Sequence, residues 1–297
     1  MMMEEKIRTC SLCPRNCNAV RYADRGEGYC RCGYLPKIAR AAPHFWEEPC
    51  ISGTKGSGTI FFSGCVLSCV FCQNEKISVG HSGKIITTDE LIDYVKKLED
   101  MGVHNINLVS PTPYIDSIIE AFTKYKPSVP VVYNTGGYEK AETIRRLDGI
   151  VDIYLPDLKY IRSELSARYS GAKDYFAYAS SALKEMVRQT GGPVFDENGI
   201  MQRGTIVRHL ILPQNTKNSI EVLHYLDSEY GENILISLMG QYVPLGKAAE
   251  YPEINRCITP REYDKVLSVL EELSLDGFAQ ELDSANKDYI PDFDLIS

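Results

Sequence analysis

The chain has 297 residues, of which 44% are hydrophobic and 24% are charged, as is usual for a soluble globular protein. Its net charge of −8 argues against a general nucleic-acid binder, because such proteins need lysine and arginine to neutralise phosphates. No apolar run reaches the roughly 20 residues of a membrane-spanning helix, and the first residues lack the apolar segment of a secretory signal. We therefore expect a cytoplasmic protein without membrane or nucleic-acid partners.

The first 50 residues are rich in Cys, Arg, Gly and Pro and show no clear helical or strand periodicity. Four of their cysteines follow the spacing C-x2-C-x3-C-x12-C, namely Cys10, Cys13, Cys17 and Cys30. Four thiolates from two nearby segments suit a closed metal site, and a metal would supply folding energy that so polar a unit lacks. Zinc and a [4Fe–4S] cluster both fit four sulfurs. We expect Cys32 and Cys50 not to be ligands.

Strand-like and helix-like segments alternate after this unit. The glycine-rich residues 53–58 are expected to be a flexible entry to the first strand. The expected strands are 59–63, 104–110, 130–137, 151–160, 205–213 and 233–244. The expected helices are 87–102, 114–125, 139–149, about 163–190, 218–231 and 259–277. A further strand-like segment is expected at 278–282.

Six strand–helix steps at this spacing favour parallel strands joined by crossover helices, and they are too few for an eightfold barrel. We therefore predict an α/β fold, either a partial (β/α)6 barrel or an open sheet, over residues 51–280. A small Cys-rich unit (1–50) precedes it and a surface tail (281–297) follows it. In such folds the chemistry lies beyond the carboxyl ends of the strands.

The ten cysteines of the sequence are unevenly placed, and nine of them precede residue 73. Disulfides are rare in a reducing cytoplasm, so clustered cysteines are more often metal ligands or catalytic groups. Cys65, Cys69 and Cys72 follow the first expected strand in the stretch SGCVLSCVFCQN. Three thiolates can hold three corners of a [4Fe–4S] cluster and leave one iron open to an external ligand. The alternatives are three unrelated buried cysteines or a zinc site completed by a distant ligand, although the nearest histidine is His81.

The spacing CxxxCxxC, with the aromatic Phe71 before its third cysteine, resembles the signature of the radical S-adenosylmethionine (SAM) superfamily. Further stretches are similar to its pyruvate formate-lyase activating enzyme-like branch, among them CSLCPRNC, HFWEEPCISGTKGSGTIFFSGC, NLVSPTPY, YNTGGYE, LPDLKY, VRHLILP and MGQYVP. The resemblance implies that the amino and carboxylate groups of SAM bind the open iron. It also implies that the reduced cluster cleaves SAM to a 5′-deoxyadenosyl radical, which abstracts hydrogen from a substrate.

The same resemblance assigns residues to the cofactor. It implies that Asn134 lies near the SAM ribose and that Lys159, of the pair Asp157 and Lys159, meets the SAM carboxylate. An ammonium group is a compact charge suited to that task. One of the neighbours Arg208 and His209 is implied to face the cofactor, and we take His209 as the candidate. Local turn and cap chemistry is the alternative role for Asn134 and Asp157.

One departure from the superfamily pattern concerns the SAM amino group. Many members carry a Gly-Gly-Glu motif after the second strand, whereas residues 110–113 here read SPTP and contain no carboxylate. We expect Ser110, Thr112 or a backbone carbonyl to take the place of the missing glutamate.

Three functions are compatible with these features. The first is a radical SAM enzyme whose substrate is a glycine in a glycyl radical enzyme, which would make the protein an activase. The second keeps the chemistry and changes the target to a peptide or small metabolite. The third is an iron–sulfur electron carrier or metal-dependent adaptor, which would not cleave SAM. For an enzyme we expect oxygen sensitivity and a low-potential reductant, flavodoxin or ferredoxin, as a partner.

Overall fold

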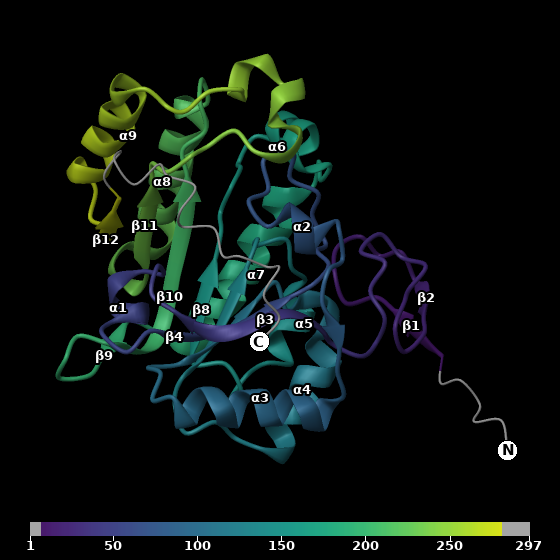
Figure 1. Cartoon of the computed structure of the whole chain (residues 1–297). Coiled ribbons are helices and arrows are strands. Elements are labelled where there is room, and N and C mark those ends of the chain that lie inside the picture. The colour runs from purple at the N-terminus through teal and green to yellow at the C-terminus, as the bar shows by residue number, and fades with distance from the viewer. Residues whose placement is uncertain (1–6, 281–297) are drawn as a thin grey trace, which may run out of the picture.

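The computed structural model describes residues 7–280 (Figure 1). Its strands are β1 (Arg8–Cys10), β2 (Ala19–Arg21), β3 (Lys37–His44), β4 (Ser57–Phe62), β5 (Lys84–Ile85), β6 (Ile106–Val109), β7 (Val131–Thr135), β8 (Ile153–Pro156), β9 (Val194–Phe195), β10 (Met201–Leu210), β11 (Leu235–Met239) and β12 (Asp276–Ala279). Its α-helices are α1 (Pro49–Ser52), α2 (Glu75–Ser78), α3 (Thr88–Asp100), α4 (Ile115–Lys124), α5 (Ala141–Arg145), α6 (Ser163–Ser170), α7 (Tyr175–Thr190), α8 (Thr216–Tyr230) and α9 (Pro260–Glu272).

One large sheet organises the chain. Its strand order is β12-β11-β10-β8-β7-β6-β4-β3-β5, with β9 paired to β10. The strands from β4 to β12 along this order are parallel neighbours, as the alternating pattern predicted. In the described part of the chain β12 and β5 end the order, so the sheet does not close on itself. This confirms the predicted α/β fold with a partial parallel barrel.

Helices pack on the outer face of the sheet in neighbouring pairs, α3 with α4, α5 with α7, and α8 with α9 (Figure 1). Helix α3 illustrates why they form. Leu91, Val95 and Leu98 recur at helical spacing and are buried in one hydrophobic cluster. The helix begins with a reciprocal capping box between Thr87 and Glu90. Within residues 7–280, none of the helices combines the length and apolar character that crossing a bilayer requires.

Helix α1 fills the inner face of the sheet. Its residues Cys50 and Ile51 pack with Val132, Ile153 and Leu235 on that face. Val132 and Ile153 pair across β7 and β8, three residues before each strand ends. This hydrophobic cluster of α1 and the sheet therefore lies below the carboxyl ends of the strands, and polar residues can occupy those ends.

The N-terminal unit differs from the sequence expectation. β1 and β2 form a small antiparallel pair beside the main sheet (Figure 1). The expectation of no regular element before residue 50 is wrong, because β3 pairs antiparallel with β4 from Ile38 opposite Phe62 to His44 opposite Ser57. The sequence KIARAAPH lacks clear alternation. Pairing with a buried neighbour, and not intrinsic propensity, makes it a strand.

Three smaller differences concern element boundaries. The helical region expected at 163–190 is two helices, α6 and α7, because Gly171 ends α6 in the left-handed conformation. The hairpin strand β9 was not predicted, although its turn contains the signal Asn198–Gly199. The strand expected at 278–282 is β12, which begins two residues earlier. The predicted tail at 281–297 lies outside the described residues.

The turn after β7 packs tightly against the end of β8 at Gly137. The φ of Gly137 is +81°, and a Cβ there would lie 2.1 Å from the carbonyl oxygen of Asp157. Gly149 has a similar φ of +77° but nothing within 4 Å of such a Cβ. We expect Gly149→Ala to cost about 1 kcal/mol and Gly137→Ala about 3 kcal/mol or more in the free energy of unfolding. Urea unfolding of both variants checks this, and equal costs would contradict the packing argument.

Candidate active site

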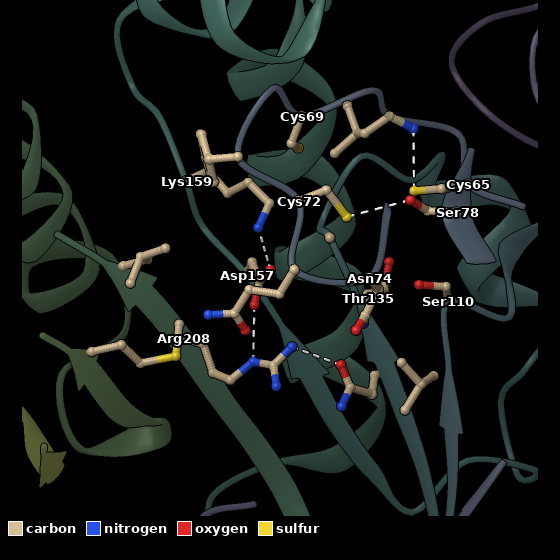
Figure 2. A pocket seen from close by; sticks show the side chains of 18 of the residues that line it. Cys65, Cys69, Cys72, Asn74, Ser78, Ser110, Thr135, Asp157, Lys159 and Arg208 are labelled. Atoms are coloured by element: carbon tan, nitrogen blue, oxygen red, sulfur yellow. Dashed lines mark hydrogen bonds and ion pairs between the residues drawn. The ribbon is translucent and has the colours of Figure 1, made fainter. Parts of the chain in front are cut away.

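A cavity of about 250 Å³ lies at the carboxyl ends of the parallel strands. The loop after β4 contributes Cys65, Cys69 and Cys72 to its wall, and the other strand ends contribute Ser110, Asn134, Asp157, Lys159 and Arg208. Figure 2 shows the cysteines gathered at one end of the cavity and Asp157 and Arg208 at the other. Most of the residues predicted to form a site therefore meet in one place.

Each cysteine sulfur of this loop contacts a hydrogen-bonding group. The Leu67 amide donates to Cys65 Sγ at 3.4 Å, the Ser170 hydroxyl donates to Cys69 Sγ at 3.0 Å, and Ser78 Oγ lies 3.3 Å from Cys72 Sγ. All three cysteines are free of disulfides. Burial, followed by the neighbouring thiols, raises the pKa of Cys65 and of Cys72. Without a metal these two thiols are therefore protonated.

The aromatic residue of the loop has a packing role beside the cavity. Phe71 lines the wall and packs edge-on against Tyr242, with 5.8 Å between ring centroids. Its ring is buried and thus packs the segment between Cys69 and Cys72 against Tyr242.

The opposite end of the cavity is an ionic network centred on Arg208. Its Nε donates to Asp157 Oδ1 at 2.9 Å, and its Nη2 donates to Asn134 Oδ1 at 2.6 Å. Lys159 forms a second ion pair with Asp157. Burial acts to raise the pKa of Asp157, but the charges of Arg208 and then Lys159 outweigh it and hold that pKa below its ordinary value. Asp157 therefore remains a carboxylate.

Glu47, which sequence analysis did not select, completes this network. Its Oε1 accepts hydrogen bonds from Asn107 at 3.0 Å and from Asn134 at 3.2 Å, and its Oε2 lies 3.4 Å from Arg208 Nη1. The segment between β3 and α1 brings it into the sheet's inner face. The signal available in the sequence was the pair of acidic residues in the otherwise apolar stretch HFWEEPC. Other lining residues that were missed include His44, Trp46, Asn74, Ser78, Thr135 and Gln241.

Two predicted cofactor residues do not line the cavity. His209 is fully buried, and its Nδ1 hydrogen-bonds to the Leu158 carbonyl at 2.7 Å. Because neighbouring strand residues point to opposite faces, Arg208 faces the cavity and His209 cannot. Thr112 is also buried, and its hydroxyl donates to Glu139 at 2.5 Å. Of the two hydroxyl candidates only Ser110 reaches the cavity, with a left-handed φ of +57°.

Glu139 joins two loops that border the cavity. It accepts hydrogen bonds from Thr112, in the loop after β6, and from Thr135, at the end of β7, both at 2.5 Å. Tyr133 is a third donor at 3.4 Å. Glu139 has no exposed surface, and its Oε2 has no partner among the described residues. This carboxyl group thus acts as a brace behind the cavity wall.

The four N-terminal cysteines predicted as ligands have different surroundings. Cys13 is buried against the main core, Cys17 is exposed, and Cys10 and Cys30 are partly buried. Cys32 Sγ contacts the Cys30 carbonyl oxygen at 3.2 Å. Within residues 7–280, no three His, Cys, Asp or Glu side chains form a group that could hold one metal ion. The assignment of these four ligands stays a prediction.

Comparisons with known proteins match most of the chain. The radical SAM superfamily model matches residues 59–224. A Methanocaldococcus jannaschii protein named "Uncharacterized protein MJ0674" is 31% identical over 284 residues, which are 91% of this chain and 76% of that protein.

Two solved structures are among those that match parts of the chain. SuiB from Streptococcus suis bound to S-adenosylmethionine has a TM-score of 0.50 at 16% identity, over 75% of this chain and 50% of SuiB. A domain of pyruvate-formate lyase-activating enzyme from Bacteroides vulgatus ATCC 8482 has a TM-score of 0.39 at 13% identity, over 65% of this chain and 91% of the domain. The likeness to SuiB shows the fold alone, and this chain spans half of SuiB.

The brace at Glu139 makes stability depend on pH. Burial raises its pKa to about 7, although the hydrogen bonds from Thr112, Thr135 and Tyr133 act to lower it. Between the ordinary value and about 7 the folded protein keeps a proton that the unfolded chain has lost, so stability falls as the pH rises through this window. As the pH rises from about 5 to about 8, we expect the free energy of unfolding of Glu139→Gln to increase by about 2–3 kcal/mol relative to that of wild type.

Urea unfolding of both proteins at several pH values measures this difference. Glu142→Gln, which changes an exposed carboxylate on α5, is the control and should show no such trend. If the two proteins differ in free energy of unfolding by the same amount at every pH, Glu139 does not have a raised pKa in the folded state.

Proposed function

The chain belongs to the radical SAM superfamily, and we propose that its active site is the cavity at the carboxyl ends of β4 to β11. Enzymes of this superfamily use a [4Fe–4S] cluster and SAM. One observation carries the proposal. Three thiols of a single loop share the cavity with the ion pairs of Asp157, Lys159 and Arg208.

The residues around the cavity fit both groups. Cys65, Cys69 and Cys72 are free thiols on one wall, each beside a hydrogen-bonding group, and such contacts tune the potential of iron–sulfur centres. When bound, the cluster supplies the electron for reductive cleavage of SAM, which starts hydrogen abstraction. Three cysteine ligands leave one coordination position for SAM itself.

The other side chains bind and orient. Lys159 offers an ammonium group to a carboxylate, while its partner Asp157 fixes it in place. Arg208 holds Asp157 and Asn134 together, so that both point into the cavity in a fixed arrangement. Ser110 is the hydroxyl that can reach the amino group, because Thr112 is engaged by Glu139. Phe71 and Leu67 supply apolar surface that excludes water from the same wall.

For the substrate we propose a glycine residue of a glycyl radical enzyme, as the resemblance of YNTGGYE, LPDLKY and similar stretches to the activating-enzyme branch suggests. A peptide or small metabolite is the alternative target. Electron paramagnetic resonance separates them, since activation leaves a stable radical on a second protein. For the reductant that such an enzyme needs, we propose flavodoxin or ferredoxin.

The enzyme proposal predicts SAM cleavage. Anaerobically reconstituted protein with dithionite and SAM is expected to form 5′-deoxyadenosine, measured by chromatography. Cys65→Ala, Cys69→Ala and Cys72→Ala should reduce it to the no-protein level, because two thiolates do not hold the cluster in its open form. Cys257→Ala, which removes an exposed cysteine, should keep it. Wild-type protein that loads a cluster and forms no 5′-deoxyadenosine would favour the electron-carrier alternative.

A second metal site, zinc or a further [4Fe–4S] cluster at Cys10, Cys13, Cys17 and Cys30, remains our proposal for the N-terminal unit. Arg21 supports it. This guanidinium is buried, and its contacts include the carbonyls of Cys32 and Gly33 and the thiol of Cys10. A buried cation is stabilised by a nearby anion, and a metal with four thiolates carries negative charge.

Cys17 gives a sharp test of that site because its side chain is exposed. If it is a ligand, Cys17→Ala should remove one zinc or about four irons per chain, measured by elemental analysis, and lower the melting temperature by several degrees. Cys257→Ala is again the control. Unchanged metal content and melting temperature in Cys17→Ala would exclude it as a ligand.

A further inference from the structure

Arg15 of the N-terminal unit reaches into the body of the protein. It lies in the stretch CSLCPRNC, and its guanidinium group donates hydrogen bonds to three backbone carbonyls outside that unit. Nε bonds to Val66 at 2.9 Å, Nη1 to Gly171 at 2.6 Å and Nη2 to Ser170 at 3.3 Å. The planar fork of an arginine suits such multiple contacts, whereas an ammonium group is a compact point charge. One side chain therefore ties the N-terminal unit to the cysteine loop (residues 63–74) and to the end of α6.

Two of the three carbonyls belong to the carboxyl end of a helix. Ser170 is the last residue of α6, and Gly171 follows it in the left-handed conformation. Carbonyls in the last turn of a helix have no donor within the helix and carry partial negative charge, so a cation is favourable there. Arg15 thus caps α6 from outside, across 155 and 156 residues of sequence.

The same helix end also contacts the cysteine loop directly. Ser170 Oγ donates to Cys69 Sγ at 3.0 Å, and the amide of the following residue, Val70, donates to a helix carbonyl at 2.9 Å. The contact from Arg15 lies at the other end of this loop segment, on the residue directly after Cys65. The segment is therefore held against α6 at both of its ends, and Arg15 makes one of the two attachments.

Two aromatic rings hold the guanidinium group in this position. Its central carbon lies 3.9 Å from the centroid of the Tyr29 ring and 5.2 Å from that of Tyr138, distances at which a ring face attracts a cation. Tyr29 belongs to the N-terminal unit, whereas Tyr138 follows β7 and donates to Asp174 at 2.6 Å. Because both bodies grip the side chain, a displacement of the unit would be passed to the cysteine loop.

We propose that Arg15 is a positioning residue for the [4Fe–4S] cluster. It fixes the loop segment between Cys65 and Cys69, and through it the N-terminal unit controls the geometry of two of the three cluster ligands. The inference rests on the proposed function, since the cluster gives that geometry its chemical consequence. Hydrogen bonds to ligand sulfurs, and the orientation they impose, tune the reduction potential of such a centre.

The restraint is measurable without iron. Cluster-free wild type and Arg15→Gln are treated with iodoacetamide in the absence of oxygen, and the initial rate at each cysteine is followed by mass spectrometry. We expect Cys69 to react about tenfold faster or more in Arg15→Gln, because the loss of hydrogen bonds from a charged donor shifts a local opening equilibrium by at least that factor. The rate at Cys50, which is buried in α1, reports global unfolding and should not change.

Two further variants locate the effect. Arg15→Lys keeps the charge and loses the fork, so it should accelerate Cys69 several-fold, and it decides the question if circular dichroism shows that Arg15→Gln does not fold. Arg8→Gln is the matched control, because Arg8 belongs to the same unit and lies 4.7 Å from the centroid of the Tyr34 ring. It should leave Cys69 protected.

A second readout uses the loaded protein. Electron paramagnetic resonance during a redox titration gives the midpoint potential of the cluster, which we expect to shift in Arg15→Gln and in Arg15→Lys but not in Arg8→Gln. A merely stabilising contact would leave the potential of the folded variants unchanged.

Four outcomes would overturn the inference. These are wild-type rates at Cys69 in the folded Arg15 variants, equal acceleration of Cys50 and Cys69, an equal effect of Arg8→Gln, and an unchanged midpoint potential. Formation of 5′-deoxyadenosine by wild type is measured separately. Its absence from loaded protein would sink the proposed function and leave the alkylation result standing, whereas product formation with Cys69 still protected in the Arg15 variants would sink the role of Arg15 alone.

Discussion

The guanidinium group of Arg208 is the contact on which the polar end of the cavity depends. It bonds to Asp157 after β8, to Asn134 at the end of β7 and to Glu47 before α1. A buried cation needs such partners, and the parallel pairing of β7, β8 and β10 brings Asp157 and Asn134 within its reach. The sheet therefore positions the charge, and the charge in turn fixes how the strand ends and the segment before α1 meet.

Lys159 connects this ionic end to the sulfur end of the cavity. Its ammonium is paired with Asp157, and its charge also acts on the thiols of Cys65 and Cys72 by lowering their pKa. Lys159 thus acts electrostatically on a carboxylate and on two thiols of the cavity wall. A carboxylate placed near Lys159 would therefore lie between the cysteine wall and the ionic end of the cavity.

The sequence predicted what local pattern controls. The alternation of apolar segments located the parallel strands, the box of Thr87 and Glu90 located the start of α3, and the spacing of Cys65, Cys69 and Cys72 located one wall of the cavity. Tertiary contacts decided the rest. The acidic pair in HFWEEPC is unusual but does not tell which face of the sheet Glu47 meets, and nothing local identifies KIARAAPH as a strand. Choosing between Arg208 and His209 required the strand's register.

The SPTP loop contains no carboxylate of its own, but it is hydrogen-bonded to one in a neighbouring loop. Thr112 in the SPTP loop donates to Glu139, which belongs to the loop after β7 and is also bonded by Thr135. Glu139 does not line the cavity, but it joins the loops after β6 and β7 that border it. Ser110, the residue of the SPTP loop at the cavity, has a left-handed φ of +57°, which is costly for a residue with a side chain. Such a conformation persists only where the surrounding structure enforces it, and the bond from Thr112 to Glu139 holds the same loop two residues further on.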